Sequence, residues 1–385
     1  PPPPPPPPPP DFQAEDGIRD LDSCLVGSEM CIRDRDIPWG RVRVVKPYIG
    51  GGFGNKQDVI LEPMVAFLTM KLGGIPVKLE LPREECIIGT RTRHSTRIRN
   101  RAAATGDGFL KGLDIECVSN TGAYASHGHA IMGAACSKSC NLYPRSVIKV
   151  KATTHYANIP AAGAMRAYGS PQVIFGIECI VEEAARAIGM DPLDFRLKNV
   201  ARQGDVNPLN KKEILSCALI ECLEKGRQLI RWDEKKKVYQ NQTGDVRRGL
   251  GVACFSYGSG TYPACVEISG ARLILNPDGS VHLQIGATEI GQGSDTAFCQ
   301  MAAETLGVTY DNIHVVSTQD TDVTPFDTGA YASRQTYVVA PAVKQAAEQL
   351  WAGILDHAAL MTGQVPEALD LIDGNNVFAN RPDKV

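Results

Sequence analysis

Three features are scarce in this chain: long apolar runs, an excess of one charge sign, and cysteine pairs at metal-binding spacing. No stretch approaches the ~18 apolar residues that cross a bilayer, so the sequence predicts no transmembrane helix. The 385 residues contain 40 Lys+Arg and 43 Asp+Glu. This near-neutral balance argues against a nucleic-acid or membrane-surface binder. The length suffices for one large or two medium domains.

The first 35 residues differ in composition from the rest. Ten prolines are followed by residues 11–35, which show no sustained period and resemble translated adapter or vector sequence. We interpret residues 1–35 as a non-native or disordered tail; a genuine proline run would form a stiff spacer or a ligand for proline-binding grooves. The other 350 residues contain 37 Lys+Arg and 36 Asp+Glu, an ordinary globular composition.

The cysteines outside this tail are scattered, apart from Cys136 with Cys140 and Cys217 with Cys222. Neither pair has a second pair at zinc or iron–sulfur spacing, so we expect small buried side chains in a reducing compartment, the cytoplasm. His127 and His129 have chelating spacing, but no third ligand lies nearby. The sequence also lacks the GxSxG motif of serine hydrolases.

Periodicity predicts an α+β protein with two mixed lobes rather than a doubly wound sheet. The lobes are expected at 36–205 and 249–385, joined by a charged segment at 206–248. Helices are expected over 61–72, over 170–188 with Ser170 as N-cap and Gly189 as terminator, and from an N-cap at Ser294. Strands are expected at 41–48, 76–81, 249–255, 271–275, 281–285 and 313–317, and a hairpin over 97–120.

Three small-residue loops could carry chemistry. Glycines at 50–54 and 286–293 let main-chain N–H groups approach an anion, and the second loop opens a helix. Arg166 and Tyr168 precede another helix and could hold an oxyanion and a flat ring. The alternatives are tight turns, a capped helix start, and a surface arginine with a core tyrosine. Alternating arginines over 91–101 favour a solvated strand face over an anion-binding strip.

Four motifs in order resemble the molybdenum-binding subunit of the xanthine dehydrogenase and aldehyde oxidase family, most closely its bacterial xanthine dehydrogenase type. They are GGGFGNKQD with the following LEP, MRAYGSPQ with MDPLDFRLKN, GATEIGQG, and PFDTGAYASR. The resemblance covers about residues 36–350. It implies two molybdopterin-binding lobes in an enzyme that oxidises a substrate carbon with water as the oxygen source.

The resemblance also implies the cofactors, partners and site residues. Molybdopterin, in a cytosine dinucleotide form in many bacterial relatives, would be held by Gly52, Phe53, Gly54, Arg166, Gly291, Gln292, Gly293, Ala332 and Ser333. Phe53, Arg166 and Ala332 would neighbour the molybdenum without being side-chain ligands, because the pterin's sulfurs bind the metal. [2Fe–2S] and FAD centres would lie on partner subunits of a cytoplasmic hetero-oligomer, with no nucleic acid or membrane as partner.

The substrate is expected to be a purine such as xanthine or hypoxanthine, or another N-heterocycle, with aldehydes as the alternative. Gln57 stands where many xanthine-oxidising members have a glutamate, and its amide can hydrogen-bond a purine without carrying charge. The arginine that faces substrate in animal xanthine oxidases falls at Ala134. Tyr168 matches one aromatic of the substrate clamp, and Tyr262 lies near the other.

One family feature is missing. The catalytic glutamate of a GEP-type motif does not occur in residues 334–385, and Glu289, which lies in the pterin-loop motif, is not expected to replace it. We therefore expect a piece of a longer gene or half of a split subunit, inactive alone. The rivals are a non-catalytic cofactor-holding or assembly subunit, and a nucleotide binder in which Lys56 contacts phosphates.

Overall fold

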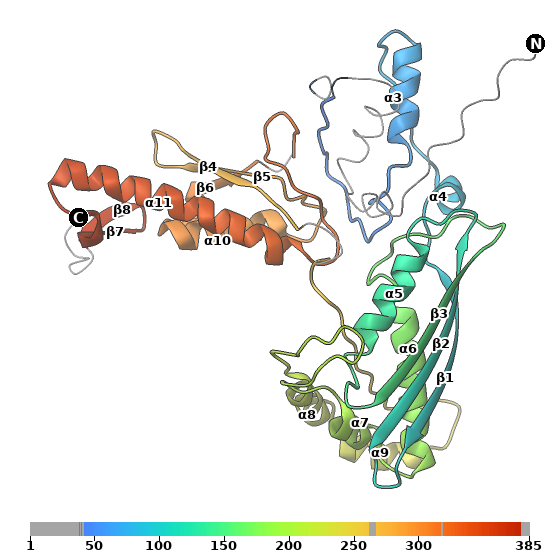
Figure 1. The fold of residues 1–385 in the computed structure, drawn as a ribbon. Helices are drawn as coiled ribbons and strands as arrows, with labels where there is room; N and C mark the ends of the chain where they lie inside the picture. The colour runs from blue at the N-terminus through green and yellow to red at the C-terminus, as the bar shows by residue number, and fades with distance from the viewer. Residues whose placement is uncertain (1–37, 39, 41, 262–266, 317–318, 379–385) are drawn as a thin grey trace, which may run out of the picture. The chain divides into compact units, whose positions relative to one another are not determined.

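The computed structural model describes residues 38, 40, 42–261, 267–316 and 319–378, which form two compact units (Figure 1). One unit is Leu81–Tyr257. The other combines the described residues up to Glu80 with those from Gly258 onward. The content is mixed helix and strand, which confirms the α+β class. The tail at 1–35 lies outside the described residues, and the lobe limits at 205 and 249 stay a prediction.

A three-stranded sheet organises the unit Leu81–Tyr257. Strands β1 (Ser95–Ala104) and β2 (Leu110–Gly122) are antiparallel, and β3 (Val147–Tyr156) lies parallel to β2 on its other side. This antiparallel pairing confirms the predicted hairpin, in whose turn the Gly108 N–H donates to the Thr105 carbonyl. The helices are α4 (Arg83–Gly89), α5 (Gly128–Ser139), α6 (Ser170–Ala187), α7 (Pro192–Asn199), α8 (Leu219–Ile230) and α9 (Trp232–Gln240).

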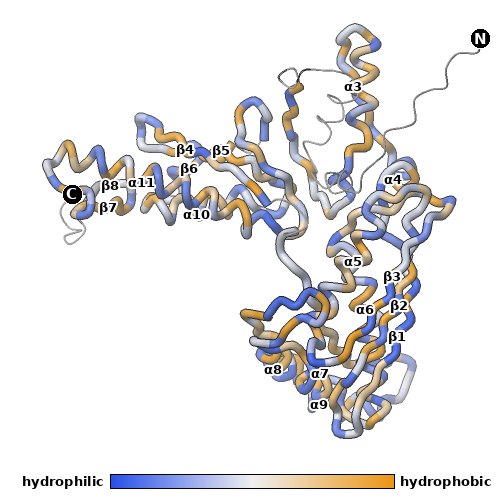
Figure 2. The backbone as a smooth tube through the Cα atoms, in the orientation of Figure 1, coloured by the Kyte–Doolittle hydropathy of each residue, from blue (hydrophilic) through white to orange (hydrophobic). Residues whose placement is uncertain are grey.

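Helices α5 and α6 cover one face of this sheet (Figure 1). Alternate residues of β2, including Ile115 and Cys117, are buried beneath them, whereas the opposite face is polar, and hydropathy alternates along the strands (Figure 2). The predicted stripe of α6 supplies Ile174, Ile177 and Val181 to this core. Each such side chain contributes about 1.5–3 kcal/mol by leaving water.

Both predicted serine N-caps are wrong by one residue. The N-caps of α6 and α10 are Gly169 and Gly293, at φ 83° and 84°, and Ser170 and Ser294 are the first helical residues. An Ala-sized Cβ at Gly169 would stand 2.8 Å from Ile131 Cγ2, so the entry to α6 requires glycine both for its backbone angle and for its packing. The predicted termination at Gly189 is confirmed by its φ of 71°.

The second unit contains another small sheet and two long helices. Strands β4 (Ala271–Leu275) and β5 (Val281–Ile285) are antiparallel, and β6 (Ile313–Val315) is parallel to β5. Helices α10 (Ser294–Leu306) and α11 (Ala340–Thr362) pack together over Phe298, Leu306 and Val343. The remaining elements are α3 (Glu62–Lys71), a π-helix (Gln335–Val339), 3-10 turns at Tyr310–Asn312 and Pro366–Ala368, and strands β7 (Leu369–Ile372) and β8 (Asn375–Phe378).

Three predicted strands are wrong. Residues 42–48, 76–81 and 249–255 form no strand, and the first has only an isolated bridge between Val45 and Asp320. Alternating polarity reports side-chain exposure, whereas a strand also needs a neighbour for its backbone hydrogen bonds. Helix α3 forms as predicted, although none of its side chains is buried.

The cysteine prediction is partly wrong. Five described cysteines are buried, namely Cys117, Cys136, Cys140, Cys254 and Cys299, but Cys179 and Cys222 are exposed. Their helices face solvent at these positions, a distinction that isolated cysteines do not reveal.

Within the described ranges, no helix is long and apolar enough to cross a membrane.

A buried ionic cluster joins α6 and α7. The Glu178 carboxylate, in a residue only 6% exposed, accepts hydrogen bonds from the Tyr143 hydroxyl at 2.6 Å, Arg196 Nε at 2.8 Å and the Cys254 N–H at 2.9 Å. Burial, followed by the Glu178 charge, raises the pKa of Tyr143 well above its ordinary value. The phenol therefore stays protonated and donates its hydrogen bond.

The Glu178→Ala variant should lose about 3–5 kcal/mol of unfolding free energy, because Arg196 would remain buried without its main counter-charge. The control is Glu182→Ala, since the Glu182 carboxylate contacts the same guanidinium at 3.1 Å but is 23% exposed. Its loss should be below about 1 kcal/mol. Urea unfolding followed by circular dichroism measures both values, and equal losses would contradict a buried charge pair.

Candidate functional site

Two of the predicted loops meet in space although they are far apart in the sequence. The Gly51 N–H donates a 2.7 Å hydrogen bond to the Ile290 carbonyl, and Lys46 Nζ donates to the Glu289 carbonyl at 3.0 Å. A Cβ on Gly52 would lie 3.1 Å from Ile290 Cδ1, so the Ile290 side chain packs closely against Gly52. The first and second glycine loops therefore form one surface of the second unit.

The first loop is a series of tight turns. Asn55 N–H donates to the Gly52 carbonyl at 3.1 Å, and Gln57 N–H donates to the Gly54 carbonyl at 3.3 Å. Phe53 is 60% exposed and left-handed at φ 54°. The Lys56 ammonium donates to the Ile49 carbonyl of the same loop, so this lysine also serves to fold the loop.

Glu289 occupies the N-terminus of α10 in the second loop. Its carboxylate accepts hydrogen bonds from the N–H groups of Gly291 at 2.5 Å, Gly293 at 3.2 Å and Asp295 at 3.1 Å, and from the Ser294 hydroxyl at 3.2 Å. Partial burial would raise the pKa of Glu289, but these donors outweigh it and lower the pKa. The carboxylate is thus an ionised helix cap, which argues against a role as a general base.

Gln292 bonds back to its own loop. Its Oε1 accepts from the Ile290 N–H at 2.7 Å, and its Nε2 donates to the Thr288 carbonyl at 3.0 Å. The amide also lies 3.5 Å from Gln335 Oε1, which links the glycine loops to the π-helix. Gln335 Nε2 is buried and has no partner among the described residues, so one amide donor lies unpaired beneath this surface.

The turn before the π-helix contains Ala332 and Ser333, left-handed at φ 48° and 54°. Arg334 fixes this turn from beneath, because its fully buried guanidinium contacts Glu267 Oε2 at 2.6 Å and Asp327 Oδ1 at 2.8 Å. The sequence alone did not indicate this role for Arg334. The signal available was an arginine at the end of a motif that also contains an aspartate.

Arg166 and Tyr168 belong to the unit Leu81–Tyr257. Arg166 is exposed, and its carbonyl accepts from Arg93 Nη2 at 2.8 Å. Tyr168 is half-buried, and its hydroxyl lies 2.9 Å from Nδ1 of the buried His127. The two rings are edge-to-face with centroids 5.8 Å apart. Tyr262, the other predicted aromatic, lies outside the described residues.

Strained backbone marks the predicted motifs. Ten described non-glycine residues have positive φ, and half of these lie in three motifs: Phe53, Ala167, Tyr168, Ala332 and Ser333. Such angles cost about 1–3 kcal/mol each and cluster at ligand-binding sites. No group of three described His, Cys, Asp or Glu residues could hold a metal ion. The strained angles in these motifs are therefore the observation that points to a ligand.

Comparison with known proteins identifies the relatives of this chain. Residues 28–200 and 225–384 each match a molybdopterin cofactor-binding domain family. The chain is 56% identical over 349 residues to the xanthine dehydrogenase molybdenum-binding subunit of Escherichia coli O157:H7, which covers 91% of this chain and 46% of that protein. It is also 34% identical to the probable hypoxanthine oxidase of Escherichia coli K12, covering 84% of this chain and 34% of that protein.

A solved structure agrees with the fold. Quinoline 2-oxidoreductase from Pseudomonas putida 86 matches with a TM-score of 0.83 and 23% identity, covering 94% of this chain and 48% of that chain. The present chain thus spans about half the length of the relatives it matches or less.

The lowered pKa of Glu289 predicts pH-dependent stability. A carboxyl whose folded pKa is depressed stabilises the fold above its ordinary pKa, and this contribution is lost as the pH falls through the lowered value. At neutral pH, Glu289→Gln should cost about 1 kcal/mol of unfolding free energy, a typical helix-cap effect. The cost should shrink toward zero only as the pH falls through this lowered pKa, because wild-type Glu289 then also becomes neutral.

Urea unfolding at a series of pH values measures this difference. Glu304→Gln is the matched control, because Glu304 is an exposed residue of the same helix. Its difference from the wild type should stay small at every pH. A Glu289→Gln cost that is constant between neutral and acidic pH would contradict the assignment of an ionised cap.

Proposed function

Because the chain belongs to the molybdopterin-binding family that contains xanthine dehydrogenase and aldehyde oxidase, we propose that it is the cofactor-binding part of a molybdenum hydroxylase. The observation that carries the proposal is the hydrogen bond from Gly51 to Ile290, which builds one glycine-lined surface from two separate motifs. When bound, the cofactor supplies the redox chemistry, with water as the oxygen source.

The described residues fit such a cofactor. Gly291 and Gly293 expose backbone without side chains, and the buried Gln335 Nε2 offers a donor that a pterin ring or its phosphate could accept. In the proposal, Gly291, Gln292 and Gly293 hold the pterin, and Ala332 and Ser333 complete the cradle. Gly52, Phe53 and Gly54 would neighbour the molybdenum, which the pterin itself binds; the corresponding role of Arg166, a residue of the unit Leu81–Tyr257, stays a prediction from the resemblance.

Substrate selection is proposed for Gln57, Tyr168 and Tyr262. A neutral amide at Gln57 can donate and accept hydrogen bonds, which suits a purine or another N-heterocycle. The names of the xanthine dehydrogenase and hypoxanthine oxidase relatives support a purine. Aldehydes are the second candidate class, because no charge at Gln57 requires a purine partner.

The complete enzyme is proposed to be a cytoplasmic hetero-oligomer with [2Fe–2S] and FAD subunits, and the pterin to be a cytosine dinucleotide. The name of the molybdenum-binding subunit relative, which implies further subunits, supports the assembly. The capped state of Glu289 favours a second candidate function, a cofactor-holding subunit whose catalytic base comes from elsewhere. A base-supplying partner that restored hypoxanthine oxidation would distinguish the enzyme from a purely assembly role.

Cofactor binding should depend on the glycine surface. Protein made in a host that synthesises molybdenum cofactor should contain about one molybdenum per chain. Gly291→Ala adds a methyl group next to Gly51, whose N lies 3.9 Å from the new Cβ. We expect retained molybdenum to fall about fivefold to tenfold, as a loss of about 1–1.4 kcal/mol of binding energy implies.

Gly279→Ala is the matched control for backbone strain. Gly279 has φ 83° in the hairpin turn of the same unit, with nothing within 4 Å of an added Cβ. Both variants strain a left-handed residue by a similar amount. Elemental analysis should show molybdenum loss only in Gly291→Ala. Equal loss in both, or none in either, would contradict the proposed cradle.

The Tyr168 ring should matter more than its hydroxyl if it stacks on the substrate. In molybdenum-loaded protein, Tyr168→Ala should weaken hypoxanthine binding about tenfold, in line with the ~1–3 kcal/mol of an aromatic–base stack. Tyr168→Phe, which keeps the ring and removes the hydroxyl that contacts His127, should bind nearly as well as the wild type. Calorimetric titration measures this, and benzaldehyde tests the alternative substrate class. Equal losses in both variants would assign Tyr168 a purely structural role.

A further inference from the structure

Strand β1 leaves one edge of the sheet open. It is the outer strand of the order β1-β2-β3, and β2 is its one pairing partner among the described strands (Figure 1). A strand at an edge presents a row of backbone donors and acceptors to solvent, and proteins usually protect such edges. The edge of β1 is ten residues long, from Ser95 to Ala104, and could accept another strand.

An open groove of about 460 Å³ lies between β1 and α6. Its lining includes Thr96, Ile98 and Asn100 from the strand and Phe175, Cys179 and Ile180 from the helix. The Phe175 residue is 73% exposed, which is unusual for an aromatic residue in a groove. Gly176 brings the helix against the strand, since a Cβ there would stand 2.8 Å from Ile98 Cγ2.

One polar atom that lines this groove has no hydrogen-bond partner among the described residues. Asn100 Oδ1 is inaccessible to solvent and accepts no hydrogen bond within the described part of the chain. A buried acceptor of this kind costs about 1–3 kcal/mol when it is left unsatisfied. The groove therefore combines the apolar side chains of Ile98 and Phe175 with a buried acceptor that no described residue satisfies.

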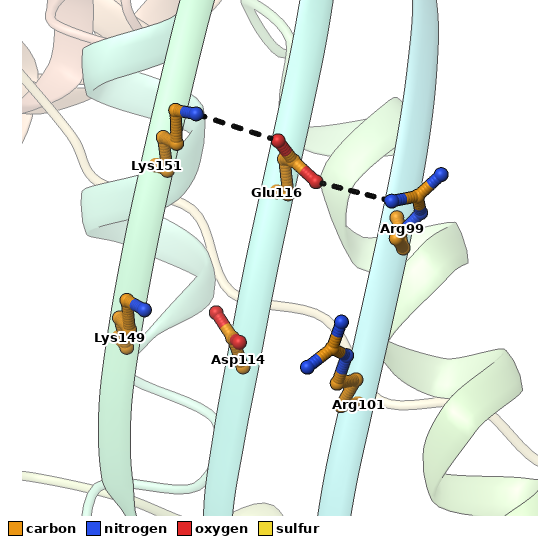
Figure 3. A pocket seen from close by; sticks show the side chains of 6 residues that line it. All are labelled: Arg99, Arg101, Asp114, Glu116, Lys149 and Lys151. Carbon is orange, nitrogen blue, oxygen red and sulfur yellow. Dashed lines mark ion pairs between the residues drawn. The ribbon is translucent and has the colours of Figure 1, made fainter.

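The opposite face of the sheet carries a charge ladder (Figure 3). Glu116 on β2 lies between Lys151 on β3 and Arg99 on β1, with N···O distances of 3.6 and 3.9 Å. One row further along, Asp114 is paired in register with Arg101 and Lys149. The charge sign alternates from strand to strand, and the ladder ends at β1 on a positive column.

We propose that the free edge of β1 binds an extended segment of a partner protein in which acidic and apolar residues alternate. A strand added to β1 lies about 4.8 Å away, and its side chains point alternately to the two sheet faces. Acidic residues would face Arg97, Arg99 and Arg101 and extend the ladder. Apolar residues would fill the groove over Ile98 and Phe175.

The pairing of β1 with β2 already places acidic residues opposite the arginines of β1. On its paired edge, β1 places Arg101 opposite Asp114 and Arg99 opposite Glu116, with Ile115 and Cys117 at the intervening core positions. The free edge presents the same β1 side chains to a second neighbour, so the same alternation is complementary there. Glu183 at the rim is the one carboxylate of the groove lining.

A second copy of this chain is the wrong occupant for this edge. Pairing β1 with β1 of another copy would place the Arg97, Arg99 and Arg101 columns side by side. Like charges on adjacent strands destabilise the pairing. The chemistry therefore selects an acidic segment, and the free chain should show no association through β1.

The test uses a fluorescent peptide that copies residues 112–119 with Ala in place of Cys117, added to the full chain. Fluorescence polarisation should show binding, whereas a scrambled peptide and one with Lys replacing both acidic residues should bind at least about tenfold more weakly. Hydrogen exchange should show protection of β1 amides. Equal binding of the three peptides, or a β1-mediated dimer in sedimentation, would overturn the proposal.

Variants of the protein separate charge from groove contacts. Arg99→Glu with Arg101→Glu should weaken the acidic peptide about tenfold and improve binding of the Lys peptide, a charge-swap rescue that misfolding cannot produce. Phe175→Ser should weaken the acidic peptide about fivefold. Phe255→Ser is the matched control, because Phe255 is 78% exposed in the same unit and does not line the groove. Equal effects of the two serine variants would overturn the groove assignment.

Discussion

A fully buried arginine, held by carboxylates, anchors the motif regions in each unit. Arg196 pairs with Glu178 beneath α6, and Arg334 pairs with Asp327 and Glu267 beneath the Ala332–Ser333 turn. A buried guanidinium tolerates no loose geometry, because any unpaired donor would lose its hydration without compensation. These charges therefore fix the elements from which the proposed site residues project.

Rigidity of this kind is needed because the loops above it adopt unfavourable backbone angles. Ala167, Tyr168 and Gly169 are three successive left-handed residues at the start of α6. Ala332 and Ser333 form a similar pair directly before Arg334. Strain persists only where surrounding contacts over-determine the conformation, and the buried ion pairs provide such contacts.

The sequence was sufficient to predict elements whose signals are local. The hairpin over β1 and β2, the strands β4 and β5, and the apolar stripe of α6 follow from alternation, turn residues and helical spacing. The strands expected at 76–81 and 249–255 did not form, because pairing partners are a property of the fold and not of the segment. Strand β3 was not predicted from periodicity for the same reason, and helix α11 was not predicted either.

The candidate site shows the same division. The motifs identified Gly291, Gln292 and Ser333 by resemblance, but they did not reveal that Glu289 caps α10 or that Arg334 anchors the neighbouring turn. Both roles depend on where a side chain bonds across a turn or between strands. Spacing alone does not contain that information.

The capping carboxylate of Glu289 has a consequence for the order of assembly. The amide donors at the start of α10 are satisfied by the chain's own side chain, so the loop needs no external anion to take its shape. The loss of conformational entropy on ordering the loop then occurs during folding, so it does not weaken a later binding event. A ligand would therefore bind a preorganised loop.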